Sequence, residues 1–116
     1  MGAFDQAIVA RPTDPAIRRT ARGDDVRIIA RSADTAGAIG MFEAWVEPGT
    51  GPDWHTHSRE TEVFHVVSGT FRFWCGDQRF DGGPGTTVTL PPHVPHQWKN
   101  IGDTLAQIMT IVTPGG

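Results

Sequence analysis

Three histidines and one glutamate have the residue types and the spacing that a metal site requires. His55 and His57 lie two residues apart in the stretch W-H-T-H-S-R-E-T-E. Side chains two residues apart on a strand share a face, with their Cα atoms roughly 6.5–7 Å apart, so both imidazoles can converge on one ion. Glu62 begins an apolar run, where burial of a carboxylate is costly unless a cation compensates it. His96 offers a third imidazole if the sheet closes on itself; otherwise the stretch is a polar loop rich in histidine.

Short strands must position these residues, because glycine and proline interrupt the sequence throughout. The 116 residues include 14 glycines and 9 prolines, which leave no room for long helices. The runs between them are β-branched or aromatic, with turn signals about 8 to 12 residues apart, as is typical of an antiparallel sandwich or barrel in one domain. S-G-T and C-G-D are predicted as hairpin turns. The predicted strands cover residues 26–30, 39–46, 62–67, 70–75, 86–90 and 106–112.

Composition and charge exclude several classes of partner. A net charge of -3 and a pI near 5.9 provide no basic stripe to neutralise phosphates, so no nucleic-acid partner is expected. No run approaches the roughly 18 apolar residues that indicate a membrane span, so no membrane partner is expected either. Cys75 is the single cysteine and the N-terminal residues lack the pattern of a secretory signal, which together favour a cytoplasmic protein.

The sequence divides near residue 22. Residues 1–22 contain Pro12 and Pro15 and show no clear period, so we interpret them as an N-terminal tail, or as an arm that exchanges with a second subunit. Residues 23–116 are interpreted as a single barrel domain.

Two spaced motifs in the sequence resemble those of the cupins. The first cupin motif is G-x5-H-x-H-x3,4-E-x6-G, and it is matched here by Gly49, His55, His57, Glu62 and Gly69. The second is G-x5-P-x-G-x2-H-x3-N, and it is matched by Gly85, Pro91, His96 and Asn100, with His93 in place of the second glycine. The chain thus resembles the small, single-domain, metal-binding cupins of the quercetinase-like, cupin 2 type.

The resemblance implies an all-β fold, the double-stranded β-helix or jelly-roll barrel, of six to eight strands. It also implies that a divalent transition metal is bound by His55, His57, Glu62 and His96. Small cupins are commonly dimers, so a homodimer is expected. The sequence differs from the second motif at His93, where the family has glycine. This difference affects one turn, because glycine permits a positive φ that histidine adopts less readily. We interpret His93 as a surface turn residue; the alternative is an extra group at the mouth of the barrel.

The implied ligand set limits both the metal and the chemistry. Three imidazoles and a carboxylate suit Fe, Mn, Co, Ni, Cu or Zn, and disfavour Ca and Mg, which prefer oxygen ligands. Four protein ligands leave an octahedral ion two open positions, enough for a bidentate substrate or for O₂ beside a substrate oxygen. The first hypothesis is therefore an oxygenase for an enol-like or aromatic small molecule, with Glu62 also acting as the base, as in flavonol-cleaving relatives. The alternatives are a non-redox cyclase, isomerase or lyase, and a small-molecule-binding protein without turnover.

Other residues refine this hypothesis. The chain has no tyrosine, which disfavours the cupin classes that use one in catalysis. The pocket is expected to be aromatic, lined from among Phe42 or Trp45, Trp54, Phe64, Phe71 or Phe73, Trp74 and Trp98. His65 is expected on the face opposite Glu62, because it lies three residues further along the strand. The charged residues expected to be exposed and without a role are Glu43, Arg59, Glu60 and Arg72.

Overall fold

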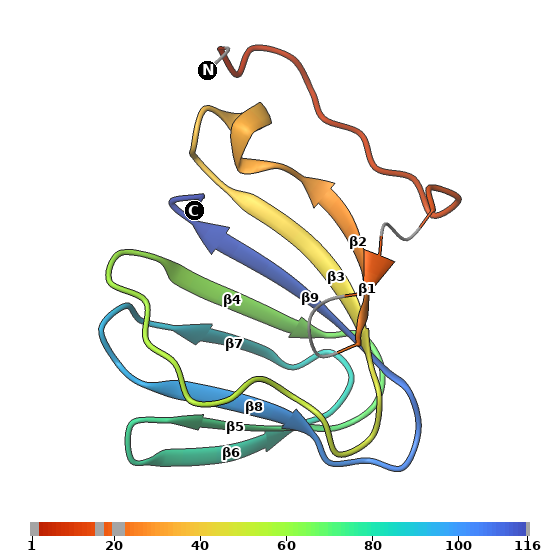
Figure 1. The fold of residues 1–116 in the computed structure, drawn as a ribbon, viewed down its shortest axis with the longest axis vertical. Helices are drawn as coiled ribbons and strands as arrows, with labels where there is room; N and C mark the ends of the chain where they lie inside the picture. Colours follow the sequence, from red (N-terminus) through yellow and green to blue (C-terminus); the bar gives the residue numbers. More distant parts are fainter. Residues whose placement is uncertain (1–2, 16–17, 20–22, 116) are drawn as a thin grey trace.

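Two antiparallel sheets make up the computed structural model, which describes residues 3–15, 18–19 and 23–115 (Figure 1). The larger sheet has the order β1-β2-β3-β9-β4-β7 and the smaller has the order β6-β5-β8. The elements are β1 Arg18–Arg19, β2 Asp25–Ala30, the 3-10 helix η1 Ser32–Thr35, β3 Gly40–Val46, β4 Thr61–Val66, β5 Phe71–Cys75, β6 Gln78–Gly82, β7 Thr87–Leu90, β8 His96–Asn100 and β9 Ala106–Thr113. The predicted all-β jelly-roll architecture is confirmed.

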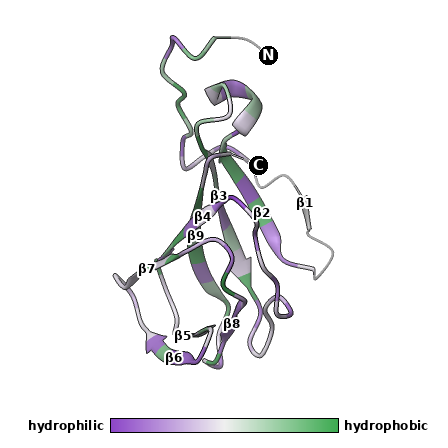
Figure 2. Ribbon diagram, turned by 90° about the vertical axis from the view of Figure 1, so that its left-hand side faces the viewer, coloured by the Kyte–Doolittle hydropathy of each residue, from purple (hydrophilic) through white to green (hydrophobic). Residues whose placement is uncertain are grey.

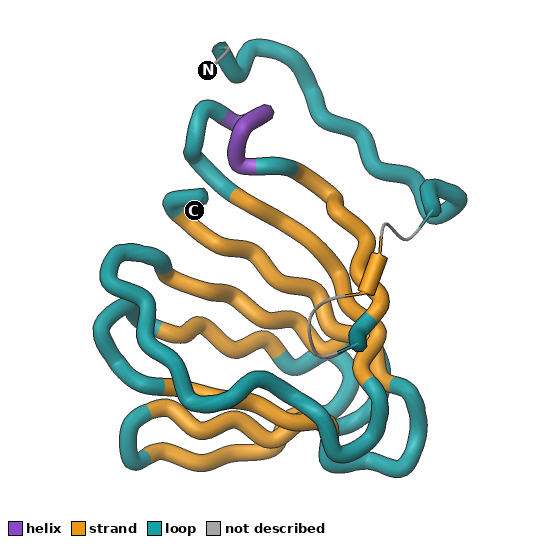
Figure 3. The backbone as a smooth tube through the Cα atoms, viewed as in Figure 1, coloured by secondary structure: helices purple, strands orange, loops and turns teal. Residues whose placement is uncertain are grey.

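Alternation along the strands places the core between the two sheets. In β5, Phe71, Phe73 and Cys75 are buried while the residues between them are half-buried. The larger sheet contributes Phe64 and Val66 from β4 in the same way. Figure 2 shows hydrophobic and hydrophilic residues alternating along the strands of the larger sheet. Figure 3 shows the strands of the two sheets arranged one after another around a common interior. The face of the larger sheet that is turned toward this interior is called the concave face.

The predicted strands agree closely with the structure, but three strands were missed. One of them, β1, has only two residues, which is too short to show an alternating pattern. The six predicted runs correspond to β2, β3, β4, β5, β7 and β9. The missed strand β6 is an edge strand with a mostly exposed, polar sequence, so it lacks the apolar alternation that marks a strand. The missed strand β8 follows a run of prolines, and its inward residues are His96, Trp98 and Asn100, of which two are polar.

One of the two predicted hairpin turns is wrong. The C-G-D turn does join paired strands, β5 and β6, and Gly76 there has a φ of 56°. The S-G-T turn instead carries the chain from β4 in the larger sheet to β5 in the smaller one. Gly69 in this turn has a φ of 82°, and a Cβ atom on it would lie 2.4 Å from the Cβ of Ala106. The glycine therefore serves a close crossing between sheets rather than a hairpin.

Glu43 is buried, contrary to the prediction that it is exposed. It is 2% exposed on β3, directly opposite Arg27 of β2, and the two side chains form an ion pair. Gln107 of β9 donates a hydrogen bond of 2.7 Å to the other carboxylate oxygen. These partners across three strands compensate the burial of the charge, which is the condition for a carboxylate to lie inside a protein. Sequence alternation alone does not show such cross-strand partners.

The N-terminal segment lies beside the edge of the larger sheet (Figure 1). Residues 3–15 contain no helix or strand, and the Arg27 guanidinium donates a hydrogen bond of 2.6 Å to the carbonyl of Arg11. The predicted boundary near residue 22 lies outside the described residues, and exchange of the segment with a second subunit stays a prediction. None of the helical segments in the described part of the chain is long and apolar enough to cross a membrane.

Candidate metal centre

The structure brings together the four residues implied to bind a metal, from segments far apart in the sequence. Glu62 lies on β4 of the larger sheet, and His96 begins β8 of the smaller sheet. His55 and His57 lie on the loop of residues 47–60, between β3 and β4. One nitrogen or oxygen atom of each residue lies within 4.8 Å of those of the other three. We call these four residues the imidazole–carboxylate cluster.

Backbone hydrogen bonds hold the loop of residues 47–60 against β8. His55 and His96 exchange both of their backbone hydrogen bonds, at 3.0 and 2.9 Å. The Asn100 N–H donates to the Thr50 carbonyl at 3.0 Å, and the Gly49 N–H donates to the Asn100 carbonyl at 2.8 Å. The loop is thus aligned as an extra strand at the edge of the smaller sheet. This pairing, rather than sequence proximity, places the first two histidines beside the third.

Gly51 permits the close approach of the loop to β8. A Cβ atom at this position would lie 1.8 Å from the carbonyl oxygen of Trp98, which is far inside van der Waals contact. The clash would be with backbone atoms, so no side-chain rotation relieves it. Any larger residue at position 51 must therefore move the loop that carries His55 and His57.

We expect Gly51→Ala to weaken metal binding at least tenfold, because both loop histidines must shift away from Glu62 and His96. Competition with a coloured chelator measures the affinity, and circular dichroism checks the fold. Gly83→Ala is the matched control, since a Cβ atom there meets nothing within 4 Å. Equal metal affinity of the two variants would contradict the role assigned to Gly51.

The three imidazoles turn the same ring nitrogen toward Glu62. The Oε1 atom of Glu62 lies 2.8 Å from Nε2 of His96, 3.0 Å from Nε2 of His57 and 3.9 Å from Nε2 of His55. Glu62 is 8% exposed and His96 is 1% exposed, whereas the side chains of His55 and His57 are each about one third exposed. The cluster is thus closed by the sheets on one side and accessible past the loop histidines on the other.

The outer nitrogens of two rings fix which nitrogen carries the proton. Nδ1 of His55 lies 2.8 Å from the carbonyl of Asp53, and Nδ1 of His96 lies 3.2 Å from the carbonyl of Val94. A carbonyl oxygen only accepts hydrogen bonds, so each Nδ1 carries the hydrogen. In the neutral imidazole this leaves Nε2 with a lone pair directed at the cluster, the arrangement that outer hydrogen bonds impose on metal-binding histidines.

Glu60 lies near the outer nitrogen of His57, beyond hydrogen-bond distance. Its Oε2 atom lies 3.6 Å from Nδ1 of His57. Carboxylates are common outer partners of metal-binding histidines, because they orient the ring and strengthen it as a ligand. Glu60 is thus half-buried beside the cluster and not exposed as predicted, and the expectation that it has no role stays a prediction.

The cluster fits a transition-metal ion. Nε2 of His57 is buried and has no hydrogen-bond partner among the described residues, although it lies 3.0 Å from a carboxylate oxygen. A lone pair that faces a carboxylate is unfavourable unless a proton or a cation lies between them. A shared cation satisfies all three imidazoles and Glu62 together. Three nitrogen donors and one oxygen donor favour a transition metal over Ca or Mg.

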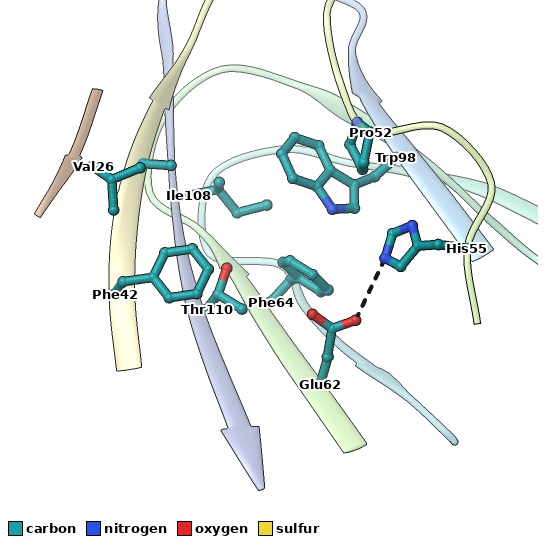
Figure 4. A pocket seen from close by; sticks show the side chains of 10 residues that line it. Val26, Phe42, Pro52, His55, Glu62, Phe64, Trp98, Ile108 and Thr110 are labelled. Carbon is teal, nitrogen blue, oxygen red and sulfur yellow. Dashed lines mark ion pairs between the residues drawn. The ribbon is translucent and has the colours of Figure 1, made fainter. Parts of the chain in front are cut away.

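An apolar pocket of about 270 Å³ adjoins the cluster (Figure 4). Its walls are formed by Val26, Phe42, Ala44, Pro52, His55, Glu62, Phe64, Trp98, Ile108 and Thr110. Figure 4 shows one oxygen of Glu62 toward His55 and the other, Oε2, toward the aromatic interior. No described residue donates a hydrogen bond to Oε2. The pocket therefore presents a free carboxylate oxygen to any molecule bound next to the cluster.

The aromatic prediction is correct in part. Phe42, Phe64 and Trp98 line the pocket. Phe71 and Phe73 are fully buried in the core instead. Three tryptophans that were predicted to line the pocket also lie outside its lining: Trp45, Trp54 and Trp74. Trp54 is 48% exposed because the loop histidine next to it points inward.

Sequence reasoning missed Thr110 of the pocket lining. It lies on β9, where Ala106, Ile108 and Thr110 alternate inward and are all buried. The sequence did contain a sign of this residue, because Thr110 is a polar residue at a position where the alternation of the strand predicts an inward-facing side chain.

Two further histidines lie outside the cluster. His65 is exposed and its Nδ1 lies 2.8 Å from the Thr87 hydroxyl, on the face opposite Glu62, as predicted. His93 is exposed and has a φ of 70°, so it adopts the left-handed conformation of the glycine in the cupin motif. Its N–H donates a hydrogen bond of 2.7 Å to the carbonyl of His57. The turn keeps its geometry despite the substitution.

We expect His93→Gly to raise the free energy of unfolding by about 0.5 kcal/mol, because relief of left-handed strain exceeds the entropy cost of glycine. Metal affinity should stay unchanged, since the backbone contact with His57 remains. Urea denaturation measures the stability. His65→Gly, within β4, is the control and should lower stability, since glycine weakens a strand. A loss of stability in His93→Gly would show that the left-handed turn is unstrained.

Comparisons with known proteins agree with this geometry. The family model described as a cupin domain matches residues 42–112. The protein SchB of Streptomyces halstedii is 33% identical over 109 residues, which cover 92% of this chain and 77% of SchB. An uncharacterised protein of Methanocaldococcus jannaschii, MJ1618, is 28% identical over 74 residues; the match spans 64% of this chain and 59% of that protein.

A solved structure shows the same fold. KdgF from a Halomonas species superposes with a TM-score of 0.82, over 97% of this chain and 96% of KdgF, at 15% sequence identity. The fold, the complete first motif and the matched family model agree with one another. This chain therefore belongs to the cupin family.

Proposed function

We propose that the protein is a metal-dependent oxygenase that acts on a small planar molecule, enol-like or aromatic, with two neighbouring oxygen atoms. The observation that supports this best is the orientation of Glu62. Its Oε1 atom faces three imidazole nitrogens, while its Oε2 atom faces the largely apolar pocket and receives no hydrogen bond from a described residue. One side chain can thus contribute to a metal site and accept a proton from a molecule in the pocket.

Each part of the site has a distinct task in this proposal. His55, His57, Glu62 and His96 would hold the ion, which would supply Lewis-acid chemistry and a binding position for O₂. Glu62 Oε2 takes the proton from the substrate hydroxyl as general base. Phe64 and the other aromatic walls exclude water and hold the substrate ring beside the cluster.

Oxygen uptake tests the proposal directly. The protein would be reconstituted separately with Fe, Mn, Co, Ni, Cu and Zn, and each form would be tested in an oxygen electrode with flavonols, catechols and β-diketones. We expect substrate-dependent uptake with at least one redox-active metal and none with His57→Ala. The proposal fails if every metal form leaves both oxygen and substrates unconsumed.

The same carboxylate also favours one alternative, a non-redox cyclase, isomerase or lyase. A base beside a Lewis acid is what enolisation of a carbonyl compound requires. Product formation without oxygen uptake, with the zinc form active, would support this class. Tight binding without any conversion would support a small-molecule-binding protein.

We expect Glu62→Gln to lower kcat by at least 100-fold at full metal occupancy, because the amide cannot accept the proton. Metal content per chain, measured by elemental analysis on the same sample, separates lost base catalysis from lost metal. Glu47→Gln is the matched control, with the same chemical change at an exposed residue outside the cluster and the pocket. An unchanged kcat in Glu62→Gln would exclude the base role.

We also propose a homodimer. Met41 and Trp45 of β3 and Met109 of β9 lie half-buried on the outer face of the larger sheet, and Phe4 and Val9 of the N-terminal segment are 49% and 63% exposed. Apolar side chains on a sheet face and on an adjacent extended segment favour contact with a second copy. A monomeric mass by light scattering at micromolar concentration would contradict the dimer.

A further inference from the structure

We propose that Thr110 is a specificity-determining residue that binds the end of the substrate remote from the cluster. The substrate class is then a single aromatic or enol-like ring, with two neighbouring oxygens at one end and one hydrogen-bonding group at the other. The inference rests on the proposed location of the substrate in the pocket, although not on the reaction that follows binding.

Strand register places Thr110 in the middle of an apolar row. Phe42 of β3 and Phe64 of β4 both pair directly with Thr110 of β9. Ile28 pairs with Phe42 on one side, and Val88 pairs with Phe64 on the other. This row crosses five adjacent strands of the concave face, and only Thr110 contributes a polar side-chain atom to it.

The hydroxyl group of Thr110 has no partner within the described part of the protein. Thr110 is 1% exposed as a residue, and none of the described residues makes a hydrogen bond with its hydroxyl, which belongs to the pocket lining and is not among the sealed side-chain atoms without a partner. Figure 4 shows the hydroxyl oxygen pointing into the pocket between the rings of Phe42 and Phe64. A ligand that fills the pocket separates this hydroxyl from water, so a ligand without a polar group at this point gives up a hydrogen bond worth about 1 kcal/mol. A ligand that pairs with the hydroxyl accounts for threonine at this position.

The separation between Thr110 and Glu62 indicates the size of the ligand. Glu62 pairs with Val112, so Thr110 is the diagonal neighbour of Glu62, two residues along β9 on the same face. Diagonal neighbours in an antiparallel pair lie about 7–8 Å apart. One six-membered ring with a substituent spans this separation.

A matched pair of ligands isolates the hydrogen bond. The probes are 3,4-dihydroxyacetophenone and 4-ethylcatechol, which share the two neighbouring oxygens and differ mainly in a carbonyl acceptor at the far end. Each would be titrated by calorimetry, without oxygen, into zinc-loaded wild-type protein, Thr110→Val and Thr110→Ser. Zinc content and thermal midpoint would be measured for every variant.

We expect Thr110→Val to bind the ketone about three- to tenfold more weakly, the range of one net hydrogen bond, and to bind 4-ethylcatechol unchanged or more tightly. Thr110→Ser, which keeps the hydroxyl, should retain the preference of the wild-type protein for the ketone. A purely structural role of Thr110 would change the thermal midpoint and affect both ligands equally.

Three outcomes would overturn the inference. They are equal effects of Thr110→Val on the two ligands, loss of the preference in Thr110→Ser, and failure of both probes to bind the wild-type protein. The proposed oxygenase activity is tested separately, because oxygen uptake can be absent while the ligand preference is present. Conversely, uptake with an unchanged preference in Thr110→Val would remove only the role of Thr110.

Discussion

Saturation of the imidazole–carboxylate cluster with zinc is expected to raise the midpoint of thermal unfolding by about 12 °C. A ligand that binds only the folded state at a free concentration of 1,000 times its Kd stabilises that state by about 4 kcal/mol. For a domain of this size, each kcal/mol corresponds to roughly 3–4 °C. The ion binds only the folded state because the four residues come from β4, β8 and one loop, which come together only when both sheets are formed.

The zinc experiment has a matched pair of variants. His57→Ala removes one imidazole of the cluster and should reduce the shift to less than about 3 °C, since the affinity falls by orders of magnitude. His65→Ala removes an exposed imidazole on the opposite face and should keep the full shift. Differential scanning calorimetry with controlled free zinc measures both. The same shift in the two variants would mean that zinc binds elsewhere.

Asn100→Asp is expected to lower the free energy of unfolding by about 3–5 kcal/mol. The Asn100 amide is fully buried and donates hydrogen bonds of 2.9 Å to the carbonyls of Val46 and Thr104, while its oxygen accepts one of 2.9 Å from the N–H of Gly102. An ionised carboxylate would place negative oxygen against two carbonyl oxygens in the interior. Two lost donors and an uncompensated charge produce the large effect.

The control for this substitution lies on the same strand. Gln97→Glu makes the same amide-to-acid change at a half-buried position of β8, where solvent can hydrate the charge. We expect it to change the stability by less than about 1 kcal/mol. Urea denaturation at neutral pH, with and without zinc, measures both variants. A small effect of Asn100→Asp would show that the amide does not hold the loops together, and that the motif asparagine has another role.

The strands and the residues of the cluster could be predicted from the sequence because both are local patterns. Alternation with period 2 marked six strands, including β4 and β9, since each has a buried and an outward face. The spacing of His55, His57 and Glu62 matched a motif in which every position is defined by its distance along the chain. Strand β6 gave no such signal, because an exposed edge strand needs no apolar face.

What the tertiary structure decided depends on contacts between segments far apart in the sequence. The sequence showed that His55 and His96 could both be metal ligands. Only the pairing of the loop with β8 shows that their ring centres lie 4.3 Å apart. It could not show that Glu43 is buried, since that depends on Arg27 and Gln107 in neighbouring strands.

Thr110 shows the same division. The run A-Q-I-M-T-I-V predicted a strand by its local alternation, and the strand is β9. That its hydroxyl lies between Phe42 and Phe64 depends on the register of three strands, which is fixed by packing of the whole concave face. Residue types and periods act over a few positions and can be read along the chain, whereas register and burial are properties of the closed barrel.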